Sequence, residues 1–402
     1  MSEPADRFSV GIAGSEGIWP NLPRTWSYSS LREATECPRR WMLSRASYPD
    51  LWNHWGYPPK PSLPALLGDV VHGALERLLR DFREHGCASL ADPGTVAVLK
   101  NLGGYSQLAE HGIEEQLTRL AENPRMSERI GPLRTALRIK VPEIRQRVQA
   151  VIARTPLRLI GEAAASGEGG PGGRGPLAPG FYPEVDLRAA DLRLAGRADL
   201  LTVLDEACDI TDYKTGSPDA HHADQVRLYA LLWSRDQELN PHSLPVHRLI
   251  LSYASHDVDV DPPSNPELNE IAADTAEQIG EAEAALLERP PTARPEASMC
   301  RYCGVRQLCD EYWAGLPGED DAEWFDFEGT VSKRNGARSW VLVATAPTDR
   351  TLLLRTSSEV VPFGVGDHLR LLDLHREDDS ESVLPIGTLT QASEIFTVEV
   401  VD

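Results

Sequence analysis

Residues 192–216, "LRLAGRADLLTVLDEACDITDYKTG", decide the fold of this chain. Two runs rich in Leu, Val, Ile and Thr lie on either side of the dipeptide Asp205-Glu206. Such runs around a two-residue turn are typical of two antiparallel strands. The second run ends with a carboxylate and an ammonium group, just before Thr215-Gly216 would turn the chain away. The unusual feature is therefore a strand that collects charge where it leaves the sheet.

The register of this predicted hairpin explains the charge. If Leu204 pairs with Ala207, the numbers of paired residues sum to 411, so Asp199 lies opposite Asp212. Opposed side chains share a face with Cβ atoms about 5 Å apart, and Lys214 projects to the same side. Two carboxylates this close repel each other unless a cation lies between them. Carboxylate oxygens suit Mg²⁺ or Mn²⁺, so the hairpin predicts a divalent-metal site.

The alternative is that the Asp-Tyr-Lys sequence forms a solvated surface pair at a strand end. The apolar neighbours of Asp199 favour the metal site, because a buried Asp rarely lacks a partner. His72, in "GDVVHGALE", is a candidate third ligand, and Gly68 would let its predicted helix approach the sheet closely. An ordinary core or surface histidine is the other interpretation of His72.

The helix predicted after the hairpin, "AHHADQVRLYALLWSR", places Gln225 and Tyr229 four residues apart on one face. We expect these two side chains to line a substrate groove beside Lys214. The structural alternative is a polar helix edge with a half-buried tyrosine.

The rest of the chain predicts a mixed α/β domain followed by a small all-β domain. Apolar spacing predicts helices at 27–45, broken at Pro38, and at 65–85, 104–155, 220–235 and 266–288. Further strands are predicted at 181–188 and 246–254. We expect an N-terminal extension at 1–24, a main domain at 25–315 with a Gly/Pro-rich insertion at 165–180, an acidic linker at 316–323, and a barrel-like, candidate OB-like domain at 324–402.

The charge of the chain limits its partners. The 402 residues carry a net charge of −21, which argues against a surface coated in basic groups for nucleic acid but leaves room for a local basic groove. Residues 316–402 hold 17 acidic and 7 basic side chains, a net charge of −10. DNA would be repelled there, so we expect this domain to dock a protein partner or to be autoinhibitory.

The same sequence predicts a cytoplasmic protein. No apolar run approaches the ~18 residues that a membrane span needs, and the first residues lack the apolar segment of a secretory signal. We therefore expect a cytoplasmic location and no membrane partner.

Six cysteines are present, and three of them cluster in "MCRYCGVRQLC" at 299–309. In a cytosolic chain such thiols are more often metal ligands or core residues than disulfides. Their spacing alone leaves open a zinc site, another metal centre and unligated core cysteines. Cys87 and Cys208 are predicted to be ordinary buried residues.

Taken in order, "GDVVHGALE", "GRADLL", "DYKTG" and "QVRLYA" resemble the PD-(D/E)XK nuclease superfamily in its RecB-like branch. The segment "SYSSLREATECPRRW" is also similar to the start of that branch, so the resemblance covers about residues 25–315. It implies a restriction-endonuclease-like mixed sheet flanked by helices. It also implies catalytic and metal-binding roles for His72, Asp199, Asp212 and Lys214, a metal contact from the Tyr213 carbonyl, a further acidic member at Glu184, and substrate binding by Gln225 and Tyr229.

The resemblance implies a Mg²⁺- or Mn²⁺-dependent deoxyribonuclease that acts on single-stranded DNA or DNA ends, in repair, recombination or mobile-element defence. The cysteines are arranged as in its iron–sulfur members, such as CRISPR-associated exonucleases and the AddB helicase–nuclease subunit. This implies a [4Fe–4S] cluster held by Cys37, Cys300, Cys303 and Cys309. The alternatives are a non-catalytic DNA-end-binding or scaffold subunit of a larger helicase–nuclease or defence complex, and a zinc-stapled regulatory protein.

Overall fold

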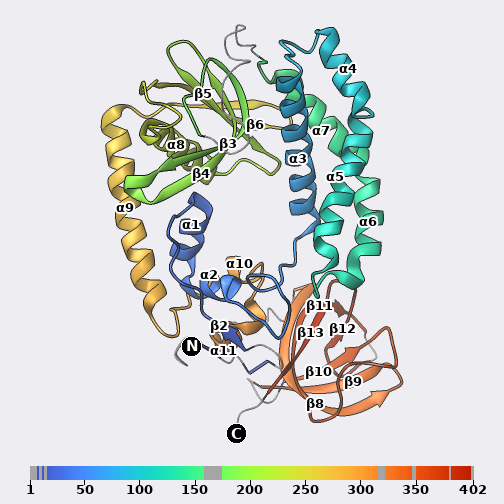
Figure 1. The fold of residues 1–402 in the computed structure, drawn as a ribbon. Coiled ribbons are helices and arrows are strands. Elements are labelled where there is room, and N and C mark those ends of the chain that lie inside the picture. Colours follow the sequence, from blue (N-terminus) through green and yellow to red (C-terminus); the bar gives the residue numbers. More distant parts are fainter. Residues whose placement is uncertain are drawn as a thin grey trace. The chain divides into compact units, whose positions relative to one another are not determined.

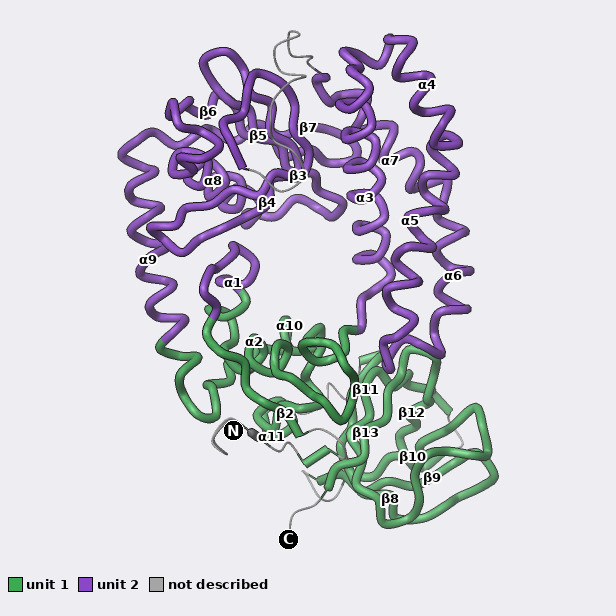
Figure 2. Tube along the Cα trace, viewed as in Figure 1, with its two compact units in different colours: residues 1–22, 33–59, 284–402 green, residues 23–32, 60–283 purple. Residues whose placement is uncertain are grey.

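The computed structural model describes residues 7–8, 11–12, 16–157, 174–315, 322–345, 350–379 and 382–399. The chain forms two compact units (Figure 2). Unit 1 comprises residues 1–22, 33–59 and 284–402, and unit 2 comprises residues 23–32 and 60–283. Three predicted segments lie mostly outside the described residues. They are the insertion at 165–180, the linker at 316–323, and residues 1–15 of the predicted extension at 1–24.

Unit 2 is built on a five-stranded mixed sheet with the strand order β3-β4-β5-β6-β7. The strands are β3 (Gly180–Ala189), β4 (Leu194–Val203), β5 (Cys208–Lys214), β6 (Val246–Tyr253) and β7 (Asp257–Val260). Only β5 and β6 pair in parallel within this sheet. The crossover between them is α8 (Ala220–Arg235), which packs on β3, β4, β5 and β6 (Figure 1).

The helical part of unit 2 packs around a core of aliphatic side chains. Its helices are α3 (Leu63–Glu84), α4 (Pro93–Asn101), α5 (Gly104–Ala121), α6 (Ile130–Ile139) and α7 (Val141–Arg154). Phe181, Leu200 and Tyr213 of the sheet join this core. Since side chains alternate along a strand, Asp212 and Lys214 face the opposite side of β5 from Tyr213, towards α8.

Several predicted elements are confirmed, and others were missed. The helix predicted at 27–45 breaks at Pro38 into α1 (Tyr28–Glu36) and α2 (Pro38–Arg45). The helix predicted at 266–288 is α9 (Asn265–Leu287). The sequence did not predict α4, which begins with a proline after an Asp N-cap, or β7, whose residues are largely exposed edge residues.

Unit 1 contains the cysteine segments and a closed five-stranded barrel. The barrel strands are β8 (Trp324–Gly336), β9 (Ser339–Ala344), β10 (Thr351–Arg355), β11 (His368–Glu377) and β12 (Ile386–Thr388), with β13 (Glu394–Val398) added beside β11. The order β12-β10-β9-β8-β11 closes because β11 also pairs with β12. The predicted small all-β, barrel-like domain is therefore confirmed, although the short strand that closes it was not predicted.

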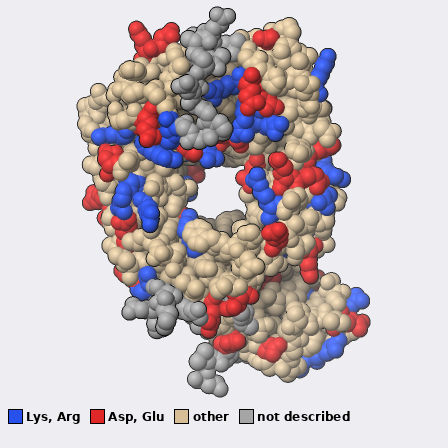
Figure 3. Space-filling model, in the orientation of Figure 1, with Lys and Arg blue, Asp and Glu red and all other residues tan. Residues whose placement is uncertain are grey.

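The remaining elements of unit 1 are short. They are β1 (Arg7–Phe8), β2 (Gly17–Ile18), α10 (Ala297–Cys300) and α11 (Asp310–Gly315). Buried residues of α2 and of the segment 303–308 share one small core. No helix in the described part of the chain combines the length and hydropathy needed to cross a membrane. Acidic and basic side chains are interspersed on the face drawn in Figure 3.

Candidate active site

The hairpin of β4 and β5 has the predicted register. Leu204 N–H donates to the Ala207 carbonyl at 2.8 Å, and Leu200 pairs with Thr211, so paired numbers sum to 411. The ladder ends at this pair. One step further, the Tyr213 N–H donates to Asp199 Oδ2 at 2.5 Å. The Asp199 carboxylate thus takes the place of a main-chain partner and lies beside the strand that carries Asp212.

A chain of polar contacts runs from β5 to α8. Lys214 Nζ lies 2.5 Å from Asp212 Oδ2 and donates to Gln225 Oε1 at 2.7 Å. Gln225 Nε2 in turn donates to the Tyr229 hydroxyl at 2.7 Å. The four side chains predicted from two separate motifs therefore form one connected set. The Asp212–Lys214 contact is an ion pair that leaves the buried Oδ2 without a well-directed hydrogen bond among the described residues.

His72 reaches the same place from α3. Its Nδ1 lies 3.7 Å from Asp199 Oδ2, and its ring contacts the Tyr213 ring edge-on with centroids 6.4 Å apart. Burial lowers the pKa of His72, while the carboxylate of Asp212 opposes this shift. The imidazole is therefore held neutral, which is the form that binds metal ions.

A third carboxylate lies in line with the two aspartates. In the β3–β4 ladder Pro183 pairs with Leu200 and Val185 with Ala198, which leaves Glu184 at the level of Asp199. Glu184 adopts a left-handed backbone with φ of +54°, which is strained for a residue with a side chain. Burial, reinforced by Glu76, raises the pKa of Glu184 to about 7.

The carboxylates repel one another at this point of the sheet. Burial raises the pKa of Asp199 well above its ordinary value, and the nearby Asp212 and Glu184 carboxylates raise it further. Lys214 acts in the opposite direction but does not cancel the effect. A cation placed among these groups would relieve both the burial and the repulsion.

A pocket opens next to His72, Asp199 and Glu184. It is lined by polar side chains of α3 and α5, including Glu76, Arg77, Arg80, Gln116 and Arg119. The predicted site residues therefore lie at the wall of a cavity that contains both acids and arginines.

Two glycines permit the close approach of the site elements. A Cβ on Gly68 of α3 would lie 2.8 Å from Thr215 Oγ1, so the helix passes directly over the turn after Lys214, as predicted. A Cβ on Gly196 of β4 would lie 2.8 Å from Tyr229 Cε1. These glycines therefore set the positions of the Asp-Tyr-Lys strand and of Tyr229.

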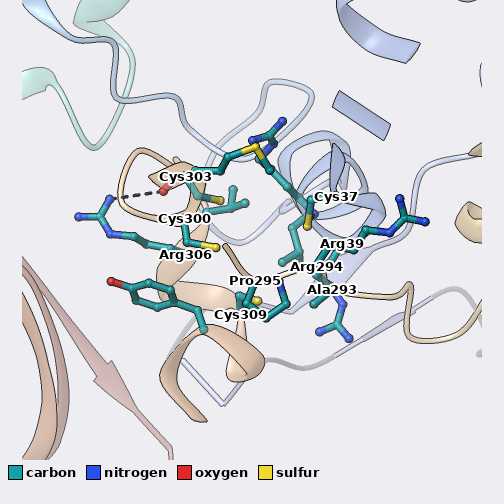
Figure 4. Close-up of a pocket in the computed structure, with 14 residues that line it drawn as sticks. Cys37, Arg39, Ala293, Arg294, Pro295, Cys300, Cys303, Arg306 and Cys309 are labelled. Carbon is teal, nitrogen blue, oxygen red and sulfur yellow. Dashed lines mark hydrogen bonds between the residues drawn. The ribbon is translucent and has the colours of Figure 1, made fainter. Parts of the chain in front are cut away.

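Four cysteines of unit 1 line a second pocket. Cys37, at the start of α2, faces Cys300, Cys303 and Cys309 across it (Figure 4). Cys87 and Cys208 are buried, Cys87 in the helical core of unit 2, as predicted. Burial raises the pKa of Cys303 to about 11 and that of Cys309 to about 12. The structure thus brings together the four thiols that were predicted to act as a set, from segments far apart in the sequence.

Neither set of side chains is closed tightly around a single point. Among the described residues, no group of three or more His, Cys, Asp or Glu side chains is arranged so that it could hold a metal ion. At the sheet, Asp212 is paired with Lys214 whereas His72 lies beside Asp199.

The comparisons with known proteins decide the family. A model described as the PD-(D/E)XK nuclease superfamily matches residues 25–310. The chain belongs to the PD-(D/E)XK nuclease superfamily. No curated protein matches it. Among solved structures, a murine DNA-binding protein bound with ds DNA is similar at 10% identity and a TM-score of 0.17, over 55% of this chain and 96% of that chain. A likeness this weak carries no argument.

Members of the PD-(D/E)XK superfamily are generally nucleases that use divalent metals, and the mixed sheet with flanking helices agrees with this fold. Sequence reasoning missed His222 and Tyr253, which lie beside Lys214. One signal was available, since His222 precedes Gln225 by three residues on the same helix. The position of Tyr253 beside Lys214 depends on the pairing of β5 with β6, so no local pattern in the sequence signals it.

Proposed function

We propose that this PD-(D/E)XK protein is a Mg²⁺- or Mn²⁺-dependent DNA nuclease of the RecB-like branch, acting on single-stranded DNA or DNA ends. The observation that carries the proposal is the meeting of Asp199 and the Asp212–Lys214 pair across the β4–β5 hairpin, with His72 beside Asp199. Repair, recombination or mobile-element defence would use such an activity.

The donor groups at the hairpin are of the chemical kind that a divalent cation binds. Asp212 Oδ2 is buried without a directed hydrogen bond among the described residues, and the pKa of Asp199 is raised by burial and by Asp212. Two carboxylates thus lie close together in a buried place where a single ammonium, that of Lys214, opposes their charge. His72, Asp199, Asp212 and the Tyr213 carbonyl would hold the ion. When bound, it would activate a water and neutralise charge on the scissile phosphate.

Lys214 is the side chain that would act on the reacting water and phosphate. Its ammonium forms an ion pair with Asp212 and donates one N–H to Gln225 Oε1. An ammonium group has three N–H donors, so donors remain for a water molecule or a phosphate oxygen. Gln225 is itself oriented by the Tyr229 hydroxyl. We therefore assign Gln225 and Tyr229 the task of fixing Lys214 and bordering the substrate.

We further propose that Cys37, Cys300, Cys303 and Cys309 hold a [4Fe–4S] cluster. The support is that all four thiols line one pocket although they come from two segments far apart in the sequence. A single zinc ion would draw the sulfur atoms to roughly 3.8 Å from one another, from its ~2.3 Å bonds. The resemblance to iron–sulfur members of the RecB-like branch is what favours the cluster over zinc. Its task would be to join the two cysteine segments of unit 1.

The acidic barrel is assigned a protein partner. Residues 316–402 carry a net charge of −10, which disfavours DNA there and suits a basic protein surface. The proposed nuclease would therefore work with a second protein docked through this domain.

The proposed activity is tested by cleavage assays on labelled single-stranded DNA and on blunt duplex ends, with Mg²⁺ and Mn²⁺ each tried. We expect cleavage by the wild type and a loss of at least a hundredfold in Asp212→Ala and Lys214→Ala, because each removes a group at the reacting centre. Equal cleavage by wild type and variants would exclude this site. Tight binding of DNA ends without cleavage would instead favour the non-catalytic scaffold.

The cluster is tested by purifying the full chain without oxygen and measuring iron, sulfide and zinc. We expect a brown protein with about four irons per chain. A colourless protein that contains zinc and no iron would replace the cluster with a Cys₄ zinc site.

A further inference from the structure

His222 lies next to the proposed active site without belonging to any of its motifs. It is in the first turn of α8, three residues before Gln225 and seven before Tyr229, so all three side chains share one face of the helix. Its Nδ1 lies 2.9 Å from the Tyr253 hydroxyl. The face of α8 that carries Gln225, the partner of Lys214, therefore also carries the imidazole of His222. That imidazole is in turn hydrogen-bonded to Tyr253.

Tyr253 is held on the same side of the sheet as the reacting groups. In the parallel ladder of β5 and β6, Tyr253 pairs with Lys214 and Leu251 with Asp212. Paired residues of neighbouring strands point to the same face. The His256 ring stacks on the Tyr253 ring with centroids 5.4 Å apart, and Tyr253 is only 4% exposed. Tyr253 is therefore a rigid support beside Lys214.

The hydrogen bonds of Tyr253 set the tautomer of His222. The backbone of Asp219 also hydrogen-bonds to the Tyr253 oxygen. Because a neutral imidazole nitrogen is a better hydrogen-bond acceptor than a phenol oxygen, the phenol proton is directed to His222 Nδ1. Burial raises the pKa of Tyr253, so the phenol keeps this proton at neutral pH. The proton of the neutral imidazole is then on Nε2, which is left to donate to something else.

His222 lies among charged groups of both signs. Burial lowers its pKa, and the nearby cations Lys214 and Arg32 lower it further, whereas the carboxylates Asp219 and Asp212 oppose the shift. The half-buried ring is thus a neutral N–H donor placed near two cationic side chains. Oxygens of a phosphate group match a site of this kind.

We propose that His222, oriented by Tyr253, binds a non-bridging oxygen of a phosphate in the DNA strand, next to the phosphate that is cut. This inference rests on the proposed nuclease function, and it makes His222 a substrate-binding residue at the Lys214 side of the site. Tyr253 acts through His222 and is a positioning residue.

The test is the affinity of the full-length protein for a fluorescent single-stranded dT oligonucleotide, measured by anisotropy without divalent ions so that no cleavage occurs. We expect His222→Ala to weaken binding about tenfold, since it removes a hydrogen bond to a charged group. His222→Gln keeps an N–H donor and should recover most of the affinity. Tyr253→Phe should have an intermediate effect. His221→Ala is the matched control, because that neighbouring side chain is exposed and should leave binding unchanged.

Cleavage kinetics add a second readout. With Mg²⁺ or Mn²⁺, His222→Ala should raise KM and change kcat little, and thermal unfolding should match that of the wild type. Affinity of His222→Ala equal to the wild type, or His222→Gln as weak as His222→Ala, would overturn the inference. The nuclease proposal would still stand in that case if the wild type cuts DNA and Asp212→Ala does not. If the wild type binds DNA with the expected His222 dependence but never cuts it, the nuclease proposal alone fails.

Discussion

At the residue scale, Glu184 shows how burial shifts the chemistry of one side chain. It is a carboxyl group on a strained backbone, in line with Asp199, and burial raises its pKa to about 7. A carboxyl group whose pKa is higher in the folded than in the unfolded chain favours folding when it is protonated. Its contribution is present at low pH and is lost as the pH rises from its ordinary pKa of 4.5 to about 7.

Glu184→Gln should therefore stabilise unit 2 at high pH only. In the absence of divalent ions we expect the variant and the wild type to unfold at the same urea concentration at pH 4.5. At pH 8 the variant should be more stable by about 1–2 kcal/mol, a figure reduced for solvent access to the side chain. A stability difference that does not change between these pH values would contradict the assigned pKa.

Gly196 tests the contact between the Asp199 strand and Tyr229. An alanine there would place a methyl group 2.8 Å from Tyr229 Cε1 and 3.0 Å from a Leu232 methyl group, both in a packed interior. We expect Gly196→Ala to lower the free energy of unfolding by about 1–3 kcal/mol and to reduce DNA cleavage, because Tyr229 must move away from Gln225. Urea unfolding and the cleavage assay measure the two effects.

Gly280→Ala is the matched control for this substitution. Gly280 lies within α9, and a Cβ there would meet no atom within 4 Å. Replacing an exposed helical glycine by alanine should stabilise the chain by about 0.5–1 kcal/mol. A lower free energy of unfolding in Gly196→Ala, together with a higher one in Gly280→Ala, would show that the effect at Gly196 comes from the tyrosine contact. Glycine replacement in general would not explain it.

At the scale of elements, α2 is preceded by Cys37, which is also a ligand of the proposed cluster. Cys37 is its N-cap, and its sulfur accepts the Arg40 N–H at 3.4 Å. Serine is a strong N-cap but a poor iron ligand. Cys37→Ser should keep the helical circular dichroism and lose most of the bound iron. Cys87→Ser, at a cysteine buried in unit 2, should retain the iron; loss of iron in both would point to general unfolding.

The barrel is joined to the cysteine segment by buried ion pairs. Arg306, between Cys303 and Cys309, is 7% exposed and contacts Asp326 of β8 at 2.6 Å and Asp373 of β11 at 2.8 Å. Asp326 also accepts hydrogen bonds from the Tyr312 hydroxyl and the Asp373 N–H. The end of the cysteine segment and the barrel are therefore held as one structure within unit 1.

Asp326→Ala should destabilise unit 1 by about 3–5 kcal/mol, because it leaves a buried guanidinium with one partner fewer. The expected signature is an earlier loss of bound iron on heating, with cleavage chemistry at the β4–β5 hairpin retained at low temperature. Asp259→Ala, at an exposed ion pair with Arg248 in unit 2, is the control and should change stability by less than about 1 kcal/mol. Similar losses for both variants would mean that burial does not govern the effect.

At the scale of the whole molecule, the two compact units separate the two proposed metal centres. The four cysteines of the proposed cluster belong to unit 1, and the residues of the β4–β5 hairpin belong to unit 2. A chain of two units with separate cores need not unfold in a single step. A ligand stabilises only the unit that binds it.

Removal of iron by oxidation and chelation should therefore lower the unfolding temperature of one transition and leave the other in place. Limited proteolysis after iron removal should cut first within 33–59 or 284–315, the segments that carry the cysteines. Differential scanning calorimetry of the protein with and without iron measures the first effect. A single transition that shifts as a whole would show that the units unfold together.

Local pattern was enough for the parts of the site that lie close together in sequence. The two-residue turn and the alternation of side chains set the register that brings Asp199 to Asp212, and helical periodicity placed Gln225 and Tyr229 on one face. Both expectations agree with the structure. They succeed because each depends on backbone geometry over a few residues.

The sequence by itself determined most of the strands and helices and the Asp-Tyr-Lys hairpin, and its resemblance to a known family grouped four cysteines as one candidate set. Only the tertiary structure decided which distant groups meet them: Glu184 beside Asp199, Tyr253 behind His222, and Arg306 in the barrel. These contacts depend on the pairing of strands far apart in the chain and on the packing of whole elements. A local run of residues carries no record of which partner strand will cover it, so such contacts appear only once the chain has folded.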